Sequence, residues 1–363
     1  RLSLVGSEMC IRDSSRYVEN SNKTYEIKYM NLLQIDIYEN EIFEQSPELL
    51  SMLLIDRTLS SENCQVNIFW ATNNYADLGV GYQYSDQITL EAITGKNGDV
   101  IKPRAVKSLE IQQQRSREMA EVFTPSWICN KQNNLIDNAW FGRENVFNVE
   151  IDNPDGSHSW IPTEGKIVFP EGKTWHDYIN ENRLEITCGE APYLVSRYDS
   201  VTGEPMPIER RIGLLDRKLR VVGENTQTSS EWLKAAQSAY MSVYGYEWQG
   251  DNLVLARESL LYTFIDYYKA KFGKKPQLKS LQYIASIISW NIWQMDGLKG
   301  VIPESCHSVQ QTVQSLFDSN ITVQECEGCQ KGNILKHNGT YCKIKDWSSN
   351  KTLTFVSLLK KGK

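Results

Sequence analysis

The middle of the chain contains a short apolar run, a tight turn and a segment suited to a helix. Residues 184–194 read LEITCGEAPYL, in which the apolar run ends in the turn Cys188-Gly189. Residues 191–198 (APYLVSRY) then have a composition that can open a helix. A strand, a turn and a helix in this order present backbone N–H groups and a helix N-terminus to a bound ligand. The pattern predicts such a unit here.

Two later segments repeat this alternation. Residues 241–246 form an apolar strand that ends at Glu247, and apolar residues recur at helical spacing over 253–260. A third apolar segment, residues 284–292, fits either a helix end or a buried strand and precedes Asp296. Strands that alternate with helices are typical of parallel sheets, in which ligands bind at the carboxyl ends of the strands. We therefore expect the two acids to lie at one edge of such a sheet.

The regions before and after this centre predict smaller units. A helical opening over 42–54 is mixed with strand-like pieces over 66–71 and 87–93, which indicates an α+β lead-in. The last part of the chain is rich in cysteine. We therefore divide the chain into a lead-in, a central α/β domain and a tail, at residues 15–116, 117–300 and 301–363.

Three elements are predicted between the lead-in and the first central strand. Residues 109–121 are a polar helix candidate. Thr124 is expected to cap a second helix through 128–136, with Pro125 at its first position. Residues 147–170 are rich in Asn, Asp, Gly, Ser and Pro and predict a β-hairpin or a loop insertion.

Four blocks in a fixed order carry a resemblance to a known family. They read EVFTP at 121–125, LEITCGEAPYL at 184–194, YGYEWQGDNLVLARESL at 244–260 and NIWQMDGL at 291–298. This series resembles the adenine-N6 DNA methyltransferases of bacterial restriction-modification systems, which bind S-adenosylmethionine. More narrowly, the run from RSREMAEVFTPSWICN through LEITCGEAPYLVSRYD is similar to the modification subunits named restriction endonuclease subunit M. The resemblance covers roughly the middle half of the chain. It implies a Rossmann-like methyltransferase sheet, with DNA and a restriction or specificity subunit as partners.

The resemblance also implies a cofactor site. S-adenosylmethionine needs a cradle for its methionine end, an acceptor for the ribose hydroxyls and a polar contact for the adenine edge. Gly189 suits the cradle, because a residue without Cβ lets a ligand approach closely. We assign Glu247 to the ribose, although Asp216 is nearer the usual distance of about 20 residues after the glycine turn. Asp296 is assigned to the adenine amino group, with a plain surface turn before Gly297 as the alternative. The predicted cofactor-binding residues are Phe123, Thr124, Pro125, Glu185, Cys188, Gly189, Ala191, Glu247 and Asp296.

One signature of this enzyme class is missing from the sequence. Adenine-N6 methyltransferases carry an Asn/Asp-Pro-Pro-Tyr/Phe motif that bonds the target amine and stacks on the flipped base. The nearest string here is Asn153-Pro154-Asp155-Gly156, which lies upstream in the predicted loop. Three interpretations stay open: another chain supplies the motif, it has diverged, or the protein binds cofactor without transferring methyl groups. No catalytic residue is therefore assigned.

The cysteines of the tail predict a metal site. The chain has 8 cysteines at uneven spacing, which does not fit a secreted disulfide framework. Cys-Glu-Gly-Cys at 326–329 is a knuckle-type pair, and other soft ligands lie before and after it. Such a set in a segment without its own apolar core suggests a structural zinc ion in a small ribbon-like unit that includes the apolar residues 352–359. Unrelated reduced thiols are the alternative. The predicted ligands are Cys306, Cys326, Cys329 and Cys342, with His307 or His337 as replacements.

Composition limits the choice of partners. The net charge of −6 and the pI near 5.5 argue against a protein that coats DNA by neutralising phosphates. The basic runs at 209–220 and 269–279 provide either a local basic groove or solvated faces. No apolar run approaches the roughly 18 residues that span a membrane, so we expect a soluble, cytoplasmic protein with no membrane partner.

The first residues of the sequence have a separate explanation. Residues 1–14 (RLSLVGSEMCIRDS) resemble the peptide obtained when a sequencing-library adapter is translated at the edge of an assembled fragment. On this interpretation Cys10 has no biological role and the segment is excluded from fold reasoning, as a tag would be. A signal peptide is the alternative, but no apolar stretch of about 7–15 residues follows the charges.

Overall fold

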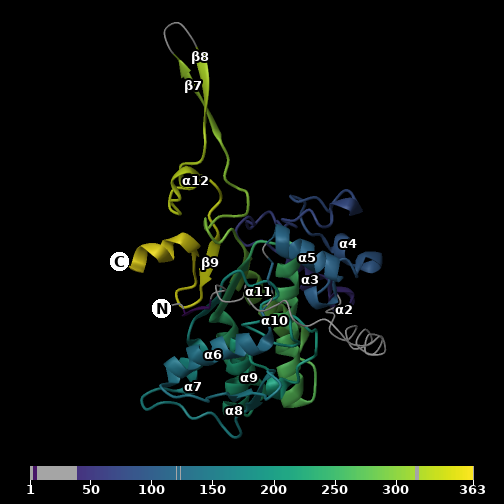
Figure 1. Ribbon diagram of the computed structural model, residues 1–363, viewed down its shortest axis with the longest axis vertical. Coiled ribbons are helices and arrows are strands. Elements are labelled where there is room, and N and C mark those ends of the chain that lie inside the picture. Colours follow the sequence, from purple (N-terminus) through teal and green to yellow (C-terminus); the bar gives the residue numbers. More distant parts are fainter. Residues whose placement is uncertain (1–2, 6–38, 120, 123, 315–318, 363) are drawn as a thin grey trace.

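The computed structural model of the chain describes residues 3–5, 39–119, 121–122, 124–314 and 319–362 (Figure 1). Phe123, one of the predicted cofactor residues, lies outside the described residues. The molecule is of mixed α/β type and contains a four-stranded parallel sheet of order β1-β4-β5-β6. These strands are β1 (Ser3–Val5), β4 (Arg183–Glu185), β5 (Val243–Glu247) and β6 (Ile292–Gln294).

Helices connect the successive strands of this sheet. The chain leaves β4, passes through α8 (Leu214–Asn225) and α9 (Ser229–Met241), and returns as β5. It then passes through α10 (Gly250–Phe272) and α11 (Leu278–Asn291) into β6. The apolar segment before Asp296 is therefore a helix end followed directly by a buried strand. Parallel neighbours joined by helical crossovers place all carboxyl ends at one edge.

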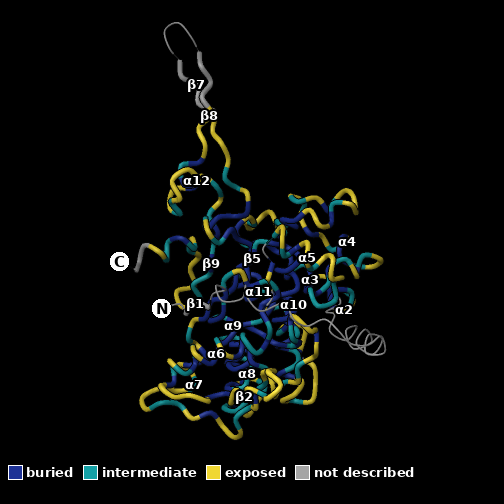
Figure 2. Tube along the Cα trace, viewed as in Figure 1, coloured by how far each residue is buried: buried dark blue, intermediate teal, exposed yellow. Residues whose placement is uncertain are grey.

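Two apolar cores enclose the sheet. The larger core includes buried residues from α3 (Pro47–Leu54), α8, α9, α10 and α11, among them Trp232 and Phe264. In the smaller core, Leu184 of β4, Tyr246 of β5 and Trp293 of β6 pack against Ile344 and other apolar residues of the tail. β4, β5 and β6 accordingly run through a deeply buried part of the molecule (Figure 2). Burial on both faces favours apolar strands. β5 and β6 are mostly apolar, whereas β4 consists of Arg183, Leu184 and Glu185, with both charged residues buried.

The region before the sheet is more helical than expected. The predicted helix over 42–54 is divided into α2 (Glu39–Gln45) and α3 (Pro47–Leu54), because Ser46 accepts the N–H of Leu49 and caps the second helix. The two predicted strands are wrong. Only isolated bridges, such as Phe69 with Gln87, occur there among the described residues, and α4 (Leu90–Ile93) begins after its cap Thr89.

The elements that precede β4 follow the sequence pattern closely. α5 (Leu109–Glu118) is the predicted polar helix, and β2 (Asn148–Asp152) and β3 (His158–Pro162) form the predicted hairpin. α6 (Ser126–Phe141) begins one residue later than expected, with Pro125 and not Thr124 at the N-cap position. Pro125 has no side-chain acceptor, and Asp199 Oδ2 instead accepts the N–H of Ser126 at 2.9 Å. α7 (Trp175–Asn180) leads into β4.

The tail consists of a hairpin, a short helix and a second strand pair. β7 (Val309–Gln314) and β8 (Ser319–Gln324) project away from the rest of the molecule beyond α12 (Glu327–Lys331) (Figure 1). β9 (Lys343–Asp346) pairs with β10 (Lys351–Thr354), which confirms only the start of the apolar strand expected over 352–359. The remaining 3₁₀ turns are η1 (Ala76–Leu78), η2 (Gly95–Asn97), η3 (Arg104–Val106), η4 (Ile208–Arg210) and η5 (Phe355–Gly362).

None of the helices in the described part of the chain is both long and apolar enough to cross a bilayer.

Two helical glycines differ sharply in the space around them. A Cβ at Gly250, the first residue of α10, would overlap the carbonyl oxygen of Phe69, whereas nothing lies within 4 Å of a Cβ at Gly223 in α8. We expect Gly250→Ala to lower the free energy of unfolding by about 1–3 kcal/mol, because the backbone has to shift. Gly223→Ala is the control and should raise it by about 0.5–1 kcal/mol. Urea unfolding measures both, and equal effects would contradict this packing.

Candidate functional site

The carboxyl edge of the sheet brings together the acids expected there. Glu185 is the last residue of β4 and pairs with Gly245, while Glu247 is the last residue of β5 and pairs with Gln294 of β6. Asp296 follows two residues after Gln294. The register thus fixes three carboxylates at the ends of three neighbouring strands.

The glycine turn is attached to the end of β5. The N–H of Gly189 donates to Glu247 Oε2 at 2.8 Å, and the N–H of Cys188 donates to the carbonyl of Tyr246 at 2.8 Å. The thiol of Cys188 packs against Gly245, where an added Cβ would come within 3.2 Å of the sulfur. Burial raises the pKa of Glu247, although the N–H of Gly189 opposes this. Cys188, Gly189 and Glu247 therefore form one contact group.

Glu185 has a different position from the one expected of a cofactor ligand. Its carboxylate accepts the N–H groups of Tyr193 at 3.3 Å and Leu194 at 3.2 Å, so it holds the loop that follows the turn. Burial raises the pKa of Glu185 well above its usual value. This carboxyl group is part of the loop's internal structure.

The helix predicted over 191–198 is wrong. Ala191 has φ 62° and Gly189 has φ 52°, both in the left-handed region that a right-handed helix cannot use. The first helix after β4 is α8, which begins at Leu214. The turn therefore offers its own backbone N–H groups to the sheet edge without a helix N-terminus behind it.

The EVFTP block lies beside the start of α10. Glu121 Oε2 accepts the side-chain N–H of Asn252 at 3.1 Å. The carbonyl of Thr124 accepts the hydroxyl of Ser200 at 2.9 Å, and Pro125 precedes the first turn of α6. This block, far from α10 in sequence, is thus fixed next to the strand that ends in Glu247.

A buried ion network connects this block to α10. Arg115 pairs with Glu121 at 2.6 Å and with Asp251 at 2.8 Å, and its side chain is 1% exposed. Asp251 also accepts the hydroxyl of Tyr75 at 2.8 Å and lies 3.4 Å from Lys107 Nζ. Burial alone would raise the pKa of Asp251, but Arg115 and Lys107 hold it below its ordinary value. This network could not be predicted from the sequence, because its members are dispersed along the chain.

Asp296 lies in a tight turn beside an aromatic pair. Its Oδ1 accepts the N–H groups of Leu298 at 3.0 Å and Lys299 at 3.1 Å, and its Oδ2 lies 3.2 Å from Lys299 Nζ. Trp248, the residue after Glu247, donates its indole N–H to the hydroxyl of Tyr84 at 3.1 Å. Burial, together with nearby carboxylates that include Asp296, raises the pKa of Tyr84 to about 12. Trp248 directly follows Glu247 in the sequence, and this position after a strand-ending acid could have indicated Trp248 as a candidate site residue.

The tail brings four metal-binding side chains together. The ligand atoms of Cys306, Cys326, Cys329 and His337 all lie within 4.8 Å of one another, so the cluster could hold a metal ion. His337 Nδ1 lies 3.5 Å from the sulfur of Cys306 and 3.6 Å from each of the other two sulfurs. Burial opposes ionisation of Cys326, but the N–H groups of Asn338 and Cys329 lower its pKa to about 6. A thiolate is the form that binds metal.

Cys342 is not a member of this cluster, which corrects the predicted ligand set. It is fully buried in the smaller core, and its thiol donates to the carbonyl of Gln294 at 3.4 Å. His337, named as a replacement, occupies the fourth position, whereas the ring Nδ1 of His307 lies 3.3 Å from the carbonyl of Ser305. The spacing of cysteines and histidines in the sequence could not distinguish Cys342 from His337 as the fourth ligand. In the structure Cys342 directly precedes β9 and lies outside the cluster.

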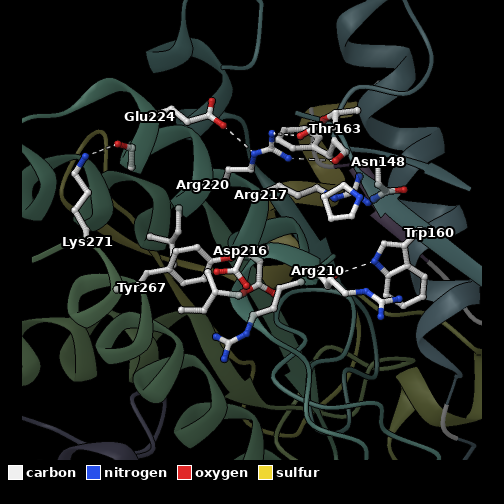
Figure 3. Close-up of a pocket in the computed structure, with 18 of the residues that line it drawn as sticks. Asn148, Trp160, Thr163, Arg210, Asp216, Arg217, Arg220, Glu224, Tyr267 and Lys271 are labelled. Carbon is white, nitrogen blue, oxygen red and sulfur yellow. Dashed lines mark hydrogen bonds and ion pairs between the residues drawn. The ribbon is translucent and has the colours of Figure 1, made fainter. Parts of the chain in front are cut away.

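A cavity lies elsewhere, between α8, the end of α10 and the β2–β3 hairpin (Figure 3). Its volume is about 460 Å³, and Asp216 alone among the candidate ribose acids lines it. Asp216 is fully buried and accepts the N–H of Ser196 at 2.8 Å. Glu247, and not Asp216, is the acid bonded to the glycine turn.

The basic residues of this cavity are used within the fold. Arg217 pairs with Asp137 at 2.7 Å, Arg220 pairs with Glu224 at 2.8 Å, and Lys271 donates to the carbonyl of Gly223 at 2.6 Å. Arg217 and Lys218 are almost completely buried. The run at 209–220 is therefore not simply a solvated face, since its central residues form part of the core.

No protein-family model, no curated protein and no solved structure matches this chain.

The buried network predicts a large effect of removing its central cation. Arg115→Met leaves Glu121 and Asp251 buried without their main partner, and we expect it to lower the free energy of unfolding by about 3–5 kcal/mol. Lys331→Met, which removes an exposed pair with Glu327, should leave the free energy of unfolding almost unchanged. Denaturant unfolding at neutral pH measures both variants. Equal, small losses would show that the network contributes little.

The corrected ligand set predicts which cysteine matters for metal binding. Tetrahedral Co²⁺ with thiolate ligands absorbs strongly in the visible range, so it reports occupancy directly. We expect Cys326→Ala to abolish the absorbance and Cys342→Ala to retain it, because only the former removes a ligand atom of the cluster. Loss of the absorbance in Cys342→Ala, while the protein stays folded by circular dichroism, would favour the ligand set predicted from the sequence. Retention by Cys326→Ala would contradict both ligand sets.

Proposed function

We propose that this chain is the modification subunit, of adenine-N6 DNA methyltransferase type, of a restriction-modification system, with a Rossmann-like sheet that binds S-adenosylmethionine. The observation that carries the proposal is the hydrogen bond between the Gly189 N–H and the Glu247 carboxylate, with Asp296 at the end of the next strand. A glycine turn and two acids at adjacent strand ends are what a nucleoside-containing cofactor requires in a doubly wound fold.

The residues present fit this cofactor. A carboxylate has about four acceptor positions, and Glu247 uses two of them for the N–H groups of Gly189 and Gln249. The remaining acceptor positions suit the two ribose hydroxyls. Asp296 suits the adenine amino group, and the half-buried ring of Trp248 suits its flat face. Thr124 and Pro125 are the proposed contacts for the methionine end.

When bound, S-adenosylmethionine supplies an electrophilic methyl group. The residues of this chain hold and orient it. Glu247 is only 7% exposed and Asp296 only 3%, so the Gly189 loop has to move for the ribose to reach Glu247. That movement exchanges the hydrogen bond from the Gly189 N–H to the Glu247 carboxylate for one from a ribose hydroxyl, which is a nearly balanced exchange.

The metal of the tail is proposed to be zinc. Three sulfur atoms and one imidazole nitrogen are a donor set typical of structural zinc, and four protein ligands leave no open position for catalysis. The proposed partners are DNA and a restriction or specificity subunit.

A second function rests on the missing motif. Asn153 and Pro154 lie in the turn of the β2–β3 hairpin, where the N–H of Asn153 donates to the carbonyl of Ser157. They form part of that turn. This favours a non-catalytic nucleic-acid-binding partner that keeps a degenerate methyltransferase fold. It predicts binding of cofactor or DNA without transfer of methyl groups to adenine by the chain alone.

Calorimetric titration with S-adenosylmethionine tests the proposal. We expect saturable binding to the unmodified chain, and a loss of about tenfold or more in affinity, roughly 1.4 kcal/mol, for Glu247→Gln. Glu209→Gln, an exposed acid at the other cavity, should bind like the unmodified chain. The absence of binding to the folded, metal-loaded chain at millimolar ligand would overturn the proposal. Incubation with DNA and labelled cofactor then separates the active from the non-catalytic alternative.

A further inference from the structure

The turn that carries Asp296 is part of a three-segment ladder. The N–H of Asp296 donates to the carbonyl of Val301 at 2.8 Å, and the N–H of Gly300 donates back to the carbonyl of Asp296 at 2.7 Å. Val301 forms antiparallel bridges on both sides, with Asp296 and with Tyr341. The N–H of Ile302 donates to Thr340 and the N–H of Cys342 donates to Gly300. Residues 340–342 therefore hold the acid-bearing turn in place.

The same segment is attached to the metal cluster. The hydroxyl of Tyr341 accepts the backbone N–H of His337 at 2.8 Å and donates to the carbonyl of Ile334 at 3.0 Å. Ser305, next to Cys306, accepts the N–H of Thr340 at 3.0 Å through its hydroxyl. Two of the four ligands thus lie within a few residues of the ladder. Cys306 follows its Val301 segment, and His337 precedes its Tyr341 segment.

Little else holds this part of the tail. Residues 325–341 contain few apolar side chains, and Leu335 is 41% exposed. In a segment without an apolar core, the free energy of metal binding is the free energy that folds it. Removal of the metal therefore frees Cys306 and His337 beside the ladder, which then keeps only its own hydrogen bonds and the packing of Ile302 and Cys342 in the smaller core.

We infer that the Cys₃His centre, acting through Tyr341, sets the position of the Asp296 turn, so that binding of S-adenosylmethionine depends on occupancy of the metal site. The inference rests on the proposed function for the role of Asp296 and extends it to the regulation of that site. Tyr341 is a positioning residue in this scheme. Because coupling between two binding sites is reciprocal, the cofactor must also tighten metal binding by the same factor.

The first test does not involve the cofactor. Amide hydrogen exchange is compared in the full chain loaded with Zn²⁺ and stripped by a chelator. We expect the amides of Asp296, Gly300, Ile302 and Cys342 to exchange about tenfold faster or more without metal, while α10 is unchanged. Unchanged exchange at these four amides in a chain shown to have lost its metal would overturn the inference, whatever the protein binds.

The second test uses a matched pair of variants. Tyr341→Phe removes the hydroxyl that links His337 to the ladder, whereas Tyr283→Phe alters an exposed tyrosine of α11. Because the variant lacks the hydroxyl through which the centre acts, we expect Tyr341→Phe to weaken S-adenosylmethionine binding about tenfold even at saturating Zn²⁺, and Tyr283→Phe to have no effect. Retained metal binding and an unchanged circular dichroism spectrum in Tyr341→Phe distinguish positioning from simple loss of structure, whereas unweakened cofactor binding would contradict the role of Tyr341.

Failure of the two proposals gives different results. If the metal-loaded chain does not bind S-adenosylmethionine, the proposed function falls, and the exchange data alone decide the coupling. If loaded and stripped chains bind the cofactor equally well, or if the cofactor leaves Zn²⁺ affinity unchanged, the coupling falls and the proposed function stands.

Discussion

The pairing of three short parallel strands is the constraint on which the candidate site depends. β4 and β6 are only three residues long, and each is held in register by β5 between them. The register places Glu185, Glu247 and the Asp296 turn in successive positions along one edge. Short strands contribute few hydrogen bonds, so their alignment depends on the apolar layers on the two faces of the sheet. The helical layer and the tail are therefore both required for the acids to meet.

Much of this arrangement could be predicted from local pattern. The apolar run before Glu247 and the helical spacing after it identified β5 and α10, because strand and helix periods are local properties. The cysteine pair at 326–329 likewise indicated a metal site. Chemistry that depends on neighbouring residues is readable from sequence when the residues involved are close together in the chain.

The errors share one cause, which is contact between distant segments. Ala191 was expected in a helix, but the Glu185 carboxylate binds the following loop, and no propensity scale contains that bond. Cys342 was chosen over His337 by residue type, whereas the ladder turns Cys342 into the smaller core. The ion pair between Arg115 and Asp251 could not be predicted, because nothing in the sequence around either residue indicates it. Each case is an override of local preference by a buried polar or apolar contact.

The cysteine of the glycine turn is buried, whereas one cysteine of the metal cluster is exposed to solvent. Cys188 supports the glycine turn from a fully enclosed position against Gly245, and burial raises its pKa far above the usual range, so it is present as an inert thiol. Cys329 of the metal cluster is exposed to solvent. Of these two sites, oxidants thus reach the Cys₃His cluster first, and sulfur chemistry there would remove a metal ligand while the turn beneath the sheet edge stays chemically intact. Oxidation at the cluster would leave the sulfur of the proposed cofactor cradle reduced.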